Sequence, residues 1–148
     1  MDNIIKELTS KDDKKAFART KEIAAASESS PKYYSSLELF ASLLNDKKSY
    51  IRTRAFILCC SQARWDDEGK LKQLLPLLMS LFHDAKPTVV RQCLNAAKEI
   101  VVFRPELGET INAELDRIDL TCYKDSMVEL IRADIAALKE LIAEADER

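Results

Sequence analysis

The sequence predicts an all-α fold, a short α-α superhelix (solenoid) of about four helical hairpins. Its 148 residues include only 2 glycines and 4 prolines, whereas strong helix formers such as Ala, Leu, Lys and Glu are abundant. Apolar residues recur at helical spacing along most of the chain. A turn pattern at residues 43–56 returns about 38 residues later at 81–94, and repeats of that length are typical of stacked helical hairpins.

The composition is that of a soluble globular protein. Hydrophobic residues make up 47% and charged residues 32% of the chain, which excludes an intrinsically disordered chain. The formal net charge of -2 disfavours nucleic acid as the partner, because phosphate contacts usually need a surplus of Lys and Arg. No apolar run approaches the roughly 20 residues of a membrane span, and no secretory signal is recognised. We therefore expect a cytoplasmic protein without a membrane partner.

The hairpins are expected within one domain, residues 1–148. The first two span about 2–28 and 31–64. In the first, Ser10 with Asp13 resembles a capping box that starts the second helix. In the second, the Ser49 hydroxyl is expected to cap the second helix. The inward-facing side chains expected on these two second helices are Ala16, Phe17, Thr20, Ile23, Ala24, Ile51, Ala55, Phe56, Leu58, Cys59 and Ala63.

The last two hairpins span about 66–103 and 105–146. Asp66 or Asp67 is placed to cap the first helix of the third hairpin, and Pro87 begins its second helix. The final helix has a charged outer face, which a terminal repeat needs in order to stay soluble.

We expect a non-enzymatic protein without metal or cofactor. The 4 cysteines lack Cys-x-x-Cys spacing, so we interpret them as reduced and buried. His83, the only histidine, is interpreted as part of a polar turn beside Asp84, because no nucleophile motif or glycine-rich phosphate loop accompanies it. Trp65 is expected to fold over the end of its hairpin rather than to anchor a partner.

The run Leu44-x-Asp46-x-x-x-x-Ile51-Arg52-x-x-Ala55 resembles the signature of HEAT repeats, members of the armadillo-like helical superfamily. The resemblance implies a hydrogen-bonded ladder between repeats, in which Asp46 or Asp84 is the partner of Arg52. The third hairpin departs from this pattern, because Val90 occupies the position of the ladder arginine. The sequence does not give the hand of the superhelix; we expect a right-handed one built of HEAT-like hairpins.

The resemblance also implies a concave surface, lined by the second helices, that binds a protein partner. We expect a basic stripe to point into that surface, and an acidic peptide is the partner that such a stripe would recognise. A solvated helix face remains the alternative interpretation. The residues of the stripe are Lys15, Arg19, Arg54, Arg64, Arg91, Gln92 and Glu99.

Two other functions remain open at this stage. One is a DNA-contacting protein related to the HEAT-like alkylpurine DNA glycosylases, which would need aromatic side chains and an acidic residue beside a flipped base. The other is self-association through an apolar end of the stack.

Overall fold

The computed structural model describes residues 2–147 of the chain. These residues form eight α-helices and no strand, so the all-α prediction is confirmed. Four short 3₁₀ helices adjoin them: η1 (Tyr34–Ser36), η2 (Ala63–Trp65), η3 (Leu81–His83) and η4 (Pro105–Leu107). The α-helices are α1 (Asp2–Leu8), α2 (Asp13–Ala26), α3 (Leu37–Ala41), α4 (Ser49–Cys60), α5 (Lys70–Ser80), α6 (Pro87–Phe103), α7 (Gly108–Leu115) and α8 (Asp125–Asp146).

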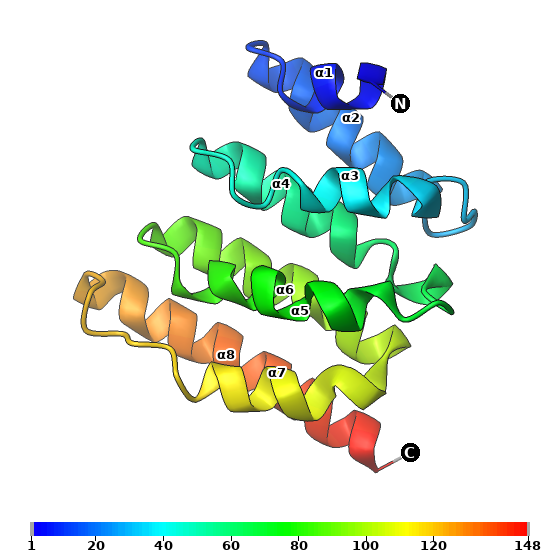
Figure 1. The fold of residues 1–148 in the computed structure, drawn as a ribbon. Coiled ribbons are helices and arrows are strands. Elements are labelled where there is room, and N and C mark those ends of the chain that lie inside the picture. The colour runs from blue at the N-terminus through cyan, green and yellow to red at the C-terminus, as the bar shows by residue number, and fades with distance from the viewer. Residues whose placement is uncertain (1, 148) are drawn as a thin grey trace.

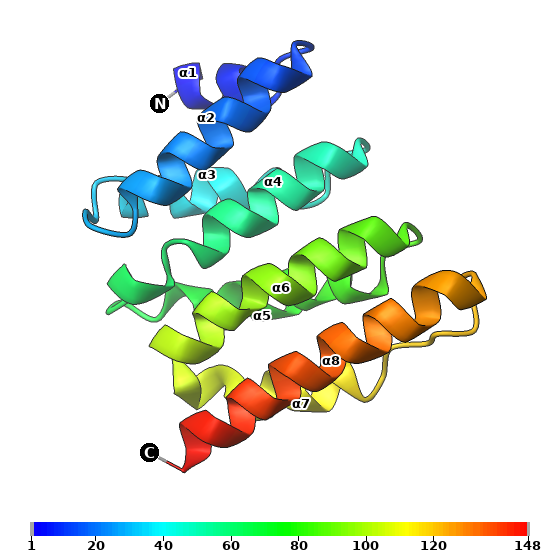
Figure 2. The same cartoon turned by 180° about the vertical axis from the view of Figure 1, so that it is seen from behind.

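Consecutive helices lie in pairs, and the pairs follow one another from the N-terminus to the C-terminus (Figure 1). Seen from behind, α2, α4, α6 and α8 lie side by side across one face (Figure 2), and each of them contacts the next. The helices α1, α3, α5 and α7 lie on the other side. We refer to the surface formed by α2, α4, α6 and α8 as the even-helix face.

One continuous core runs between the two layers. Phe40, Phe56 and Phe82 are almost completely buried, and the ring centroids of Phe56 and Phe82 are 6.0 Å apart. Helix α4 is buried around most of its circumference, because it lies between α2 and α6 as well as against α3. In the described part of the chain, no helix combines the length and apolar character needed to cross a membrane.

The turns inside the four pairs share one hydrogen-bond pattern. In each turn a backbone N–H donates to the side-chain oxygen of the residue two positions earlier. Such a bond holds a turn in shape without a backbone partner. The acceptors are Ser10, Asp46, Asp84 and Asp119, and the donors, at 3.1, 2.9, 2.9 and 2.9 Å, are the amides of Asp12, Lys48, Lys86 and Thr121.

At the ends of the pairs opposite these turns, side-chain hydrogen-bond donors contact backbone carbonyls of the preceding pair. The indole Nε1 of Trp65 donates to the Ser27 carbonyl at 2.7 Å, so Trp65 does fold over the hairpin end. One pair later, Arg104 Nε donates to the Ala63 carbonyl at 2.7 Å. These carbonyls follow α2 and α4, where the helix itself offers no further donors.

The predicted caps of two helices are wrong. Helix α2 begins at Asp13, and its N-cap is Asp12, whose carboxylate accepts from the Lys15 amide at 3.2 Å. The Ser10 hydroxyl is already used in the turn. The Ser49 hydroxyl accepts from Lys86 Nζ at 3.0 Å and makes no cap. The Asp66 carboxylate does accept from the first amides of α5, with Lys70 N at 2.8 Å.

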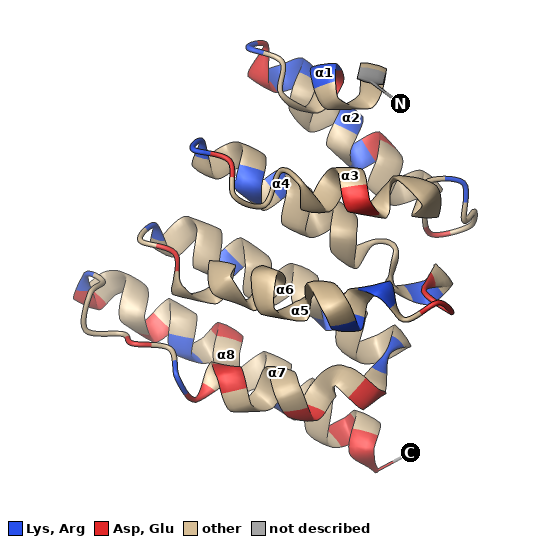
Figure 3. Ribbon diagram, viewed as in Figure 1, with Lys and Arg blue, Asp and Glu red and all other residues tan. Residues whose placement is uncertain are grey.

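Charged residues lie both at the turns and along the helices (Figure 3). Lys and Arg positions stand beside Asp and Glu positions at both ends of the pairs. Acidic positions are prominent along α7 and at the C-terminal end of α8. Both signs therefore occur along the edges of the stack.

Candidate functional site

A groove of about 320 Å³ on the even-helix face is lined by residues of α2, α4 and α6. Its lining comes from three of the four helices of the even-helix face and mixes polar with apolar groups, as the lining of ligand sites does. Its lining residues are Asp13 and Phe17 of α2, Ser49, Tyr50, Thr53, Arg54 and Ile57 of α4, and Thr88, Val89 and Gln92 of α6.

Two aromatic side chains in this groove are open to solvent. Phe17 is 48% exposed and Tyr50 is 42% exposed. The prediction that Phe17 faces the core is wrong. The buried side of α2 is formed by Ala16, Thr20 and Ile23, and Phe17 lies one residue further round the helix. An exposed phenylalanine keeps apolar surface in contact with water. A bound partner that covered the ring would remove this unfavourable contact.

Arg54 is the most unusual side chain of the groove, because it is only 6% exposed. Its Nη2 donates to the Asp13 carboxylate. Its guanidinium carbon lies 5.0 Å from the centroid of the Tyr50 ring. Its Nη1 has no hydrogen-bond partner among the described residues. A buried donor left unpaired costs about 1–3 kcal/mol, so Arg54 has unused hydrogen-bonding capacity.

Two lysines stand at the edge of the groove. Lys86 Nζ donates to the hydroxyl of the lining residue Ser49 at 3.0 Å. Lys48 Nζ lies 5.9 Å from the centroid of the Tyr50 ring. Together with Arg54 they place three cationic groups here, whereas Asp13 is the acidic residue that lines the groove.

The other predicted residues of the stripe do not join this groove. Lys15 and Arg19 line a separate hollow between α1 and α2. There Arg19 pairs with Glu7 and Glu22, at 3.1 and 2.9 Å. One of these carboxylates, that of Glu7, belongs to α1. The position of Arg19 on α2 alone does not reveal this contact.

Arg64 and Glu99 lie towards the opposite end of the face and pair with each other, with Nη2 to Oε1 at 3.6 Å. The Arg64 guanidinium also stacks over the Phe103 ring, 4.4 Å from its centroid. Burial raises the pKa of the Glu99 carboxyl, and Arg64 opposes that shift. Arg91 Nε pairs with Asp134 of α8 at 2.7 Å.

The expected basic stripe is therefore divided and largely neutralised. Arg54 and Gln92 share the groove, while the other predicted residues lie in three other places on the face. Arg54, expected to point into a concave surface, lines the groove but is largely buried there. Each arginine of the stripe has a carboxylate partner on its own or a neighbouring helix.

Sequence reasoning missed Asp13, Tyr50 and Lys86 as parts of the site. The exposure of Tyr50 could have been found, because it falls outside the apolar arc of α4. The approach of Asp13 to Arg54 could not, because it depends on how α2 and α4 cross.

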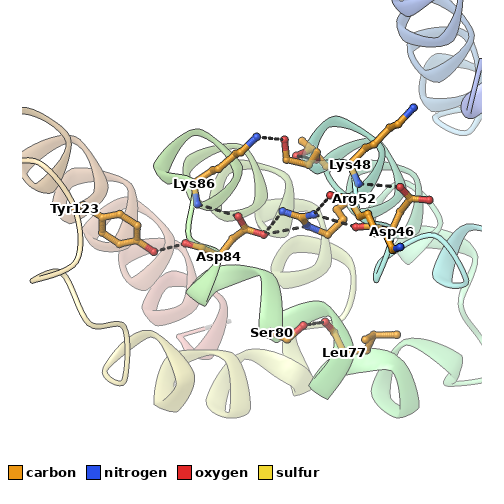
Figure 4. Close-up of polar contacts among 11 residues, drawn as sticks. Asp46, Lys48, Arg52, Leu77, Ser80, Asp84, Lys86 and Tyr123 are labelled. Atoms are coloured by element: carbon orange, nitrogen blue, oxygen red, sulfur yellow. Dashed lines mark hydrogen bonds and ion pairs between the residues drawn. The ribbon is translucent and has the colours of Figure 1, made fainter. Parts of the chain in front are cut away.

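The ladder residues lie at the turn edge of the stack rather than in the groove (Figure 4). Arg52 Nε and Nη2 donate to Asp84 Oδ2 at 3.1 and 2.8 Å. Arg52 Nη1 donates to the backbone carbonyls of Asp46 and Lys47 at 2.9 and 3.1 Å. The Asp46 carboxylate, one of the two expected partners, accepts from the Lys48 amide instead.

The following pair is connected differently. Val90, at the position of the ladder arginine, is buried. The Tyr123 hydroxyl donates to the Asp84 carbonyl at 2.6 Å (Figure 4). Tyr123 thus links the fourth pair to the third through a residue that the HEAT-like signature does not include.

His83 and the cysteines are not among the residues that line the groove. His83 Nε2 lies 2.5 Å from Glu114 Oε2, so its partner is not the adjacent Asp84. Cys59, Cys60 and Cys93 are buried, but Cys122 is exposed, which corrects the expectation of four buried thiols. Burial raises the pKa of the Cys59 thiol to about 12. Within residues 2–147, no cluster of three or more His, Cys, Asp or Glu side chains could hold a metal ion.

Comparison with models of protein families, with curated proteins and with solved structures found no match to this chain.

Proposed function

We propose that the protein is a non-enzymatic, HEAT-like repeat scaffold that binds a protein partner on its even-helix face. In this proposal the four helix pairs are the repeats of a short right-handed α-α superhelix. The same side-chain-to-amide turn in all four pairs supports it. The contact of Arg52, in the second pair, with Asp84, in the third pair, also supports it, because repeat proteins are held together by interactions between neighbouring units.

The observation that carries the binding proposal is the groove across α2, α4 and α6, with Phe17 and Tyr50 exposed in it. Tyrosine, phenylalanine and arginine are enriched at protein interfaces. Aromatic side chains that are partly exposed in the free chain lose apolar surface to a partner that covers them, which favours binding. The second helices contact one another along the stack, as the inner side of a curved solenoid does. We therefore propose that this face is concave and that the partner lies along it.

The predicted binding residues take different parts in this proposal. Arg54 and Gln92 contact the partner inside the groove. Arg64, Arg91 and Glu99 belong to the same face beyond the groove, and Lys15 and Arg19 border its α1 end. The three buried thiols are consistent with the reducing cytoplasm, where we propose that the protein acts.

A DNA-contacting function is the second candidate, and one observation favours it. The groove contains an acidic residue, Asp13, together with two exposed aromatic rings, the combination that holding a flipped base would need. However, Asp13 is bonded to Arg54, and the arginines of the face are paired with carboxylates. This pairing weakens the attraction for phosphates on which DNA binding depends.

Photocrosslinking tests the proposal. Benzoylphenylalanine is placed at Gln92 in the groove, or at Gln73 on α5 as a matched exposed control. A partner that crosslinks from Gln92 and not from Gln73 is identified and purified, and its direct binding to the chain is then measured. Equal crosslinking from both positions contradicts the proposal. A crosslink to a second copy supports self-association, and salt-dependent binding of duplex DNA supports the second candidate.

A further inference from the structure

The Arg54 side chain lines the groove and is almost completely buried there. A buried guanidinium needs a counter-charge and hydrogen bonds to most of its donors, because its desolvation is costly. In the groove, Nη2 contacts the Asp13 carboxylate and Nη1 contacts no acceptor within the described residues. The apolar side chains of Ile57 and Val89 are also part of the lining. The groove therefore offers hydrogen-bond donors and a positive charge next to apolar surface.

The chemistry of the missing group follows from these contacts. Arginine has only donors, so the group must be an acceptor, and the neighbouring Lys48 and Lys86 favour an anion. A carboxylate matches the planar fork of a guanidinium, and the Asp13 carboxylate shows that one fits against Arg54. The Phe17 and Tyr50 rings can cover the aliphatic part of the same ligand. An acidic peptide that also carries apolar side chains meets all these conditions.

Asp13 is well placed to give way to such a ligand. It is the first residue of α2, and its side chain is 72% exposed. Its carboxylate can therefore turn into water, whereas the Arg54 side chain, 7% exposed, cannot follow. Tyr50, which lies over the guanidinium, is also exposed enough to swing aside.

We propose that Arg54 is the anchor for a carboxylate of an acidic peptide segment on the partner, which seats its apolar side chains against Phe17 and Tyr50. Asp13 occupies the place of that carboxylate when no partner is bound. This inference rests on the proposed function, because it takes the even-helix face as the binding surface and adds the class of segment that it recognises.

The test is an NMR titration of the full chain with a defined probe. The probe is a capped ten-residue peptide composed of Glu and Leu, and its control carries Gln in place of every Glu. We expect the Glu peptide to shift the Arg54 Nε–H, Phe17 and Tyr50 signals in a saturable way. The Gln peptide should bind at least about tenfold more weakly, because the charge-assisted contact is lost.

Three variants make the test specific. Arg54→Gln should weaken binding of the Glu peptide about tenfold or more, and Phe17→Ala, at an exposed position, should weaken it without threatening the fold. Asp13→Asn should strengthen binding about threefold to tenfold, because the competing carboxylate is removed. Glu22→Gln makes the same change in net charge on α2 without touching Arg54, and it should leave the affinity unchanged.

The inference is overturned if the Arg54→Gln variant binds the Glu peptide as tightly as the parent chain does. If Arg54→Gln does not fold, the same criterion applies to Phe17→Ala. It is also overturned if Asp13→Asn and Glu22→Gln have equal effects, or if an oligothymidylate produces the same shifts at lower concentration. Crosslinking from Gln92 separates the two proposals. If a partner is still captured there while the acidic peptide fails, only the anchor role of Arg54 is wrong; if no partner is captured, the proposed function fails.

Discussion

Arg52 of α4 holds Asp84, a residue of the next helix pair, through hydrogen bonds of 3.1 and 2.8 Å to a single carboxylate oxygen. Both side chains are largely shielded, with 19% and 10% of their surface exposed. The third nitrogen of the same guanidinium, Nη1, donates to the backbone carbonyls of Asp46 and Lys47. Arg52 therefore fixes the turn of its own pair and the distance to the next pair at once.

Removing this arginine should destabilise the protein. We expect Arg52→Ala to lower the free energy of unfolding by about 2–4 kcal/mol, because it leaves a shielded carboxylate without its counter-charge. A double-mutant cycle with Asp84→Ala should give a coupling energy of about 1–3 kcal/mol. Urea denaturation followed by circular dichroism measures both quantities.

The matched control is Arg117→Ala. Arg117 is 73% exposed and pairs with Glu114 at 3.5 Å, so its loss should cost less than about 1 kcal/mol. If Arg52→Ala costs no more than Arg117→Ala, the contact between the second and third pairs does not stabilise the fold as described.

Truncating the Phe56 side chain in the core between the two layers should destabilise the protein. Its ring is buried and packs against Phe82, so Phe56→Ala should lower the free energy of unfolding by about 3–5 kcal/mol. Phe17→Ala removes the same group from an exposed position and should cost less than about 1 kcal/mol. Thermal and urea unfolding compare the two; equal losses would mean that Phe17 is packed in solution.

The thiols should differ sharply in reactivity. Cys122 is exposed, whereas Cys59, Cys60 and Cys93 are buried, and burial raises the pKa of the Cys60 thiol well above its usual value. Because the thiolate is the reactive form, we expect Ellman's reagent to modify Cys122 alone in the native protein at neutral pH. The other three should react only in denaturant. Rapid native reaction of more than one thiol would contradict this arrangement.

Alkaline pH should destabilise the protein through the buried side chains of Cys59 and Tyr123. Burial raises the pKa of Cys59 from 9.0 to about 12, and burial, with hydrogen bonding to Cys122, raises the pKa of Tyr123 from 10.0 to about 12. Above the unfolded-state values, the unfolded chain loses these protons while the folded chain keeps them. The unfolded chain then binds fewer protons, so stability falls as pH rises.

This contribution is complete below about pH 9 and is lost as the pH rises towards about 12. The urea midpoint should therefore decline as the pH rises from about 9 towards about 12, and Cys59→Ala should make the decline shallower. A midpoint that stays constant over that range, or an equal slope in the variant, would show that these groups titrate as they do in the unfolded chain.

Local patterns predicted much of the fold, because helix boundaries depend on nearby residues. Pro87 begins α6, and the final helix ends at Asp146, as expected. The Ser49 cap failed because Lys86, from the next pair, takes the hydroxyl. Phe17 was misplaced because it lies at the boundary of the apolar arc, where the crossing of α2 over α4 decides which side is covered.

The site was harder to predict than the helices. Helical position alone placed Arg54 and Gln92 on the correct face, and both line the groove. It could not show that Arg54 is buried or that Arg91 pairs with Asp134, because these facts depend on contacts between residues 41 and 43 positions apart, in neighbouring helix pairs. The recurrence of Asp46 and Asp84 is the one long-range relation that the sequence displays directly.

We propose that a protein partner binds along the even-helix face. Hydrogen–deuterium exchange of the chain, alone and with the purified partner recovered by crosslinking, tests it most directly. We expect partner-dependent protection in the turns that precede α4 and α6 and in the first turns of these helices, with little change in α3, α5 and α7. Protection confined to those three helices, or no protection at saturating partner, would contradict the claim.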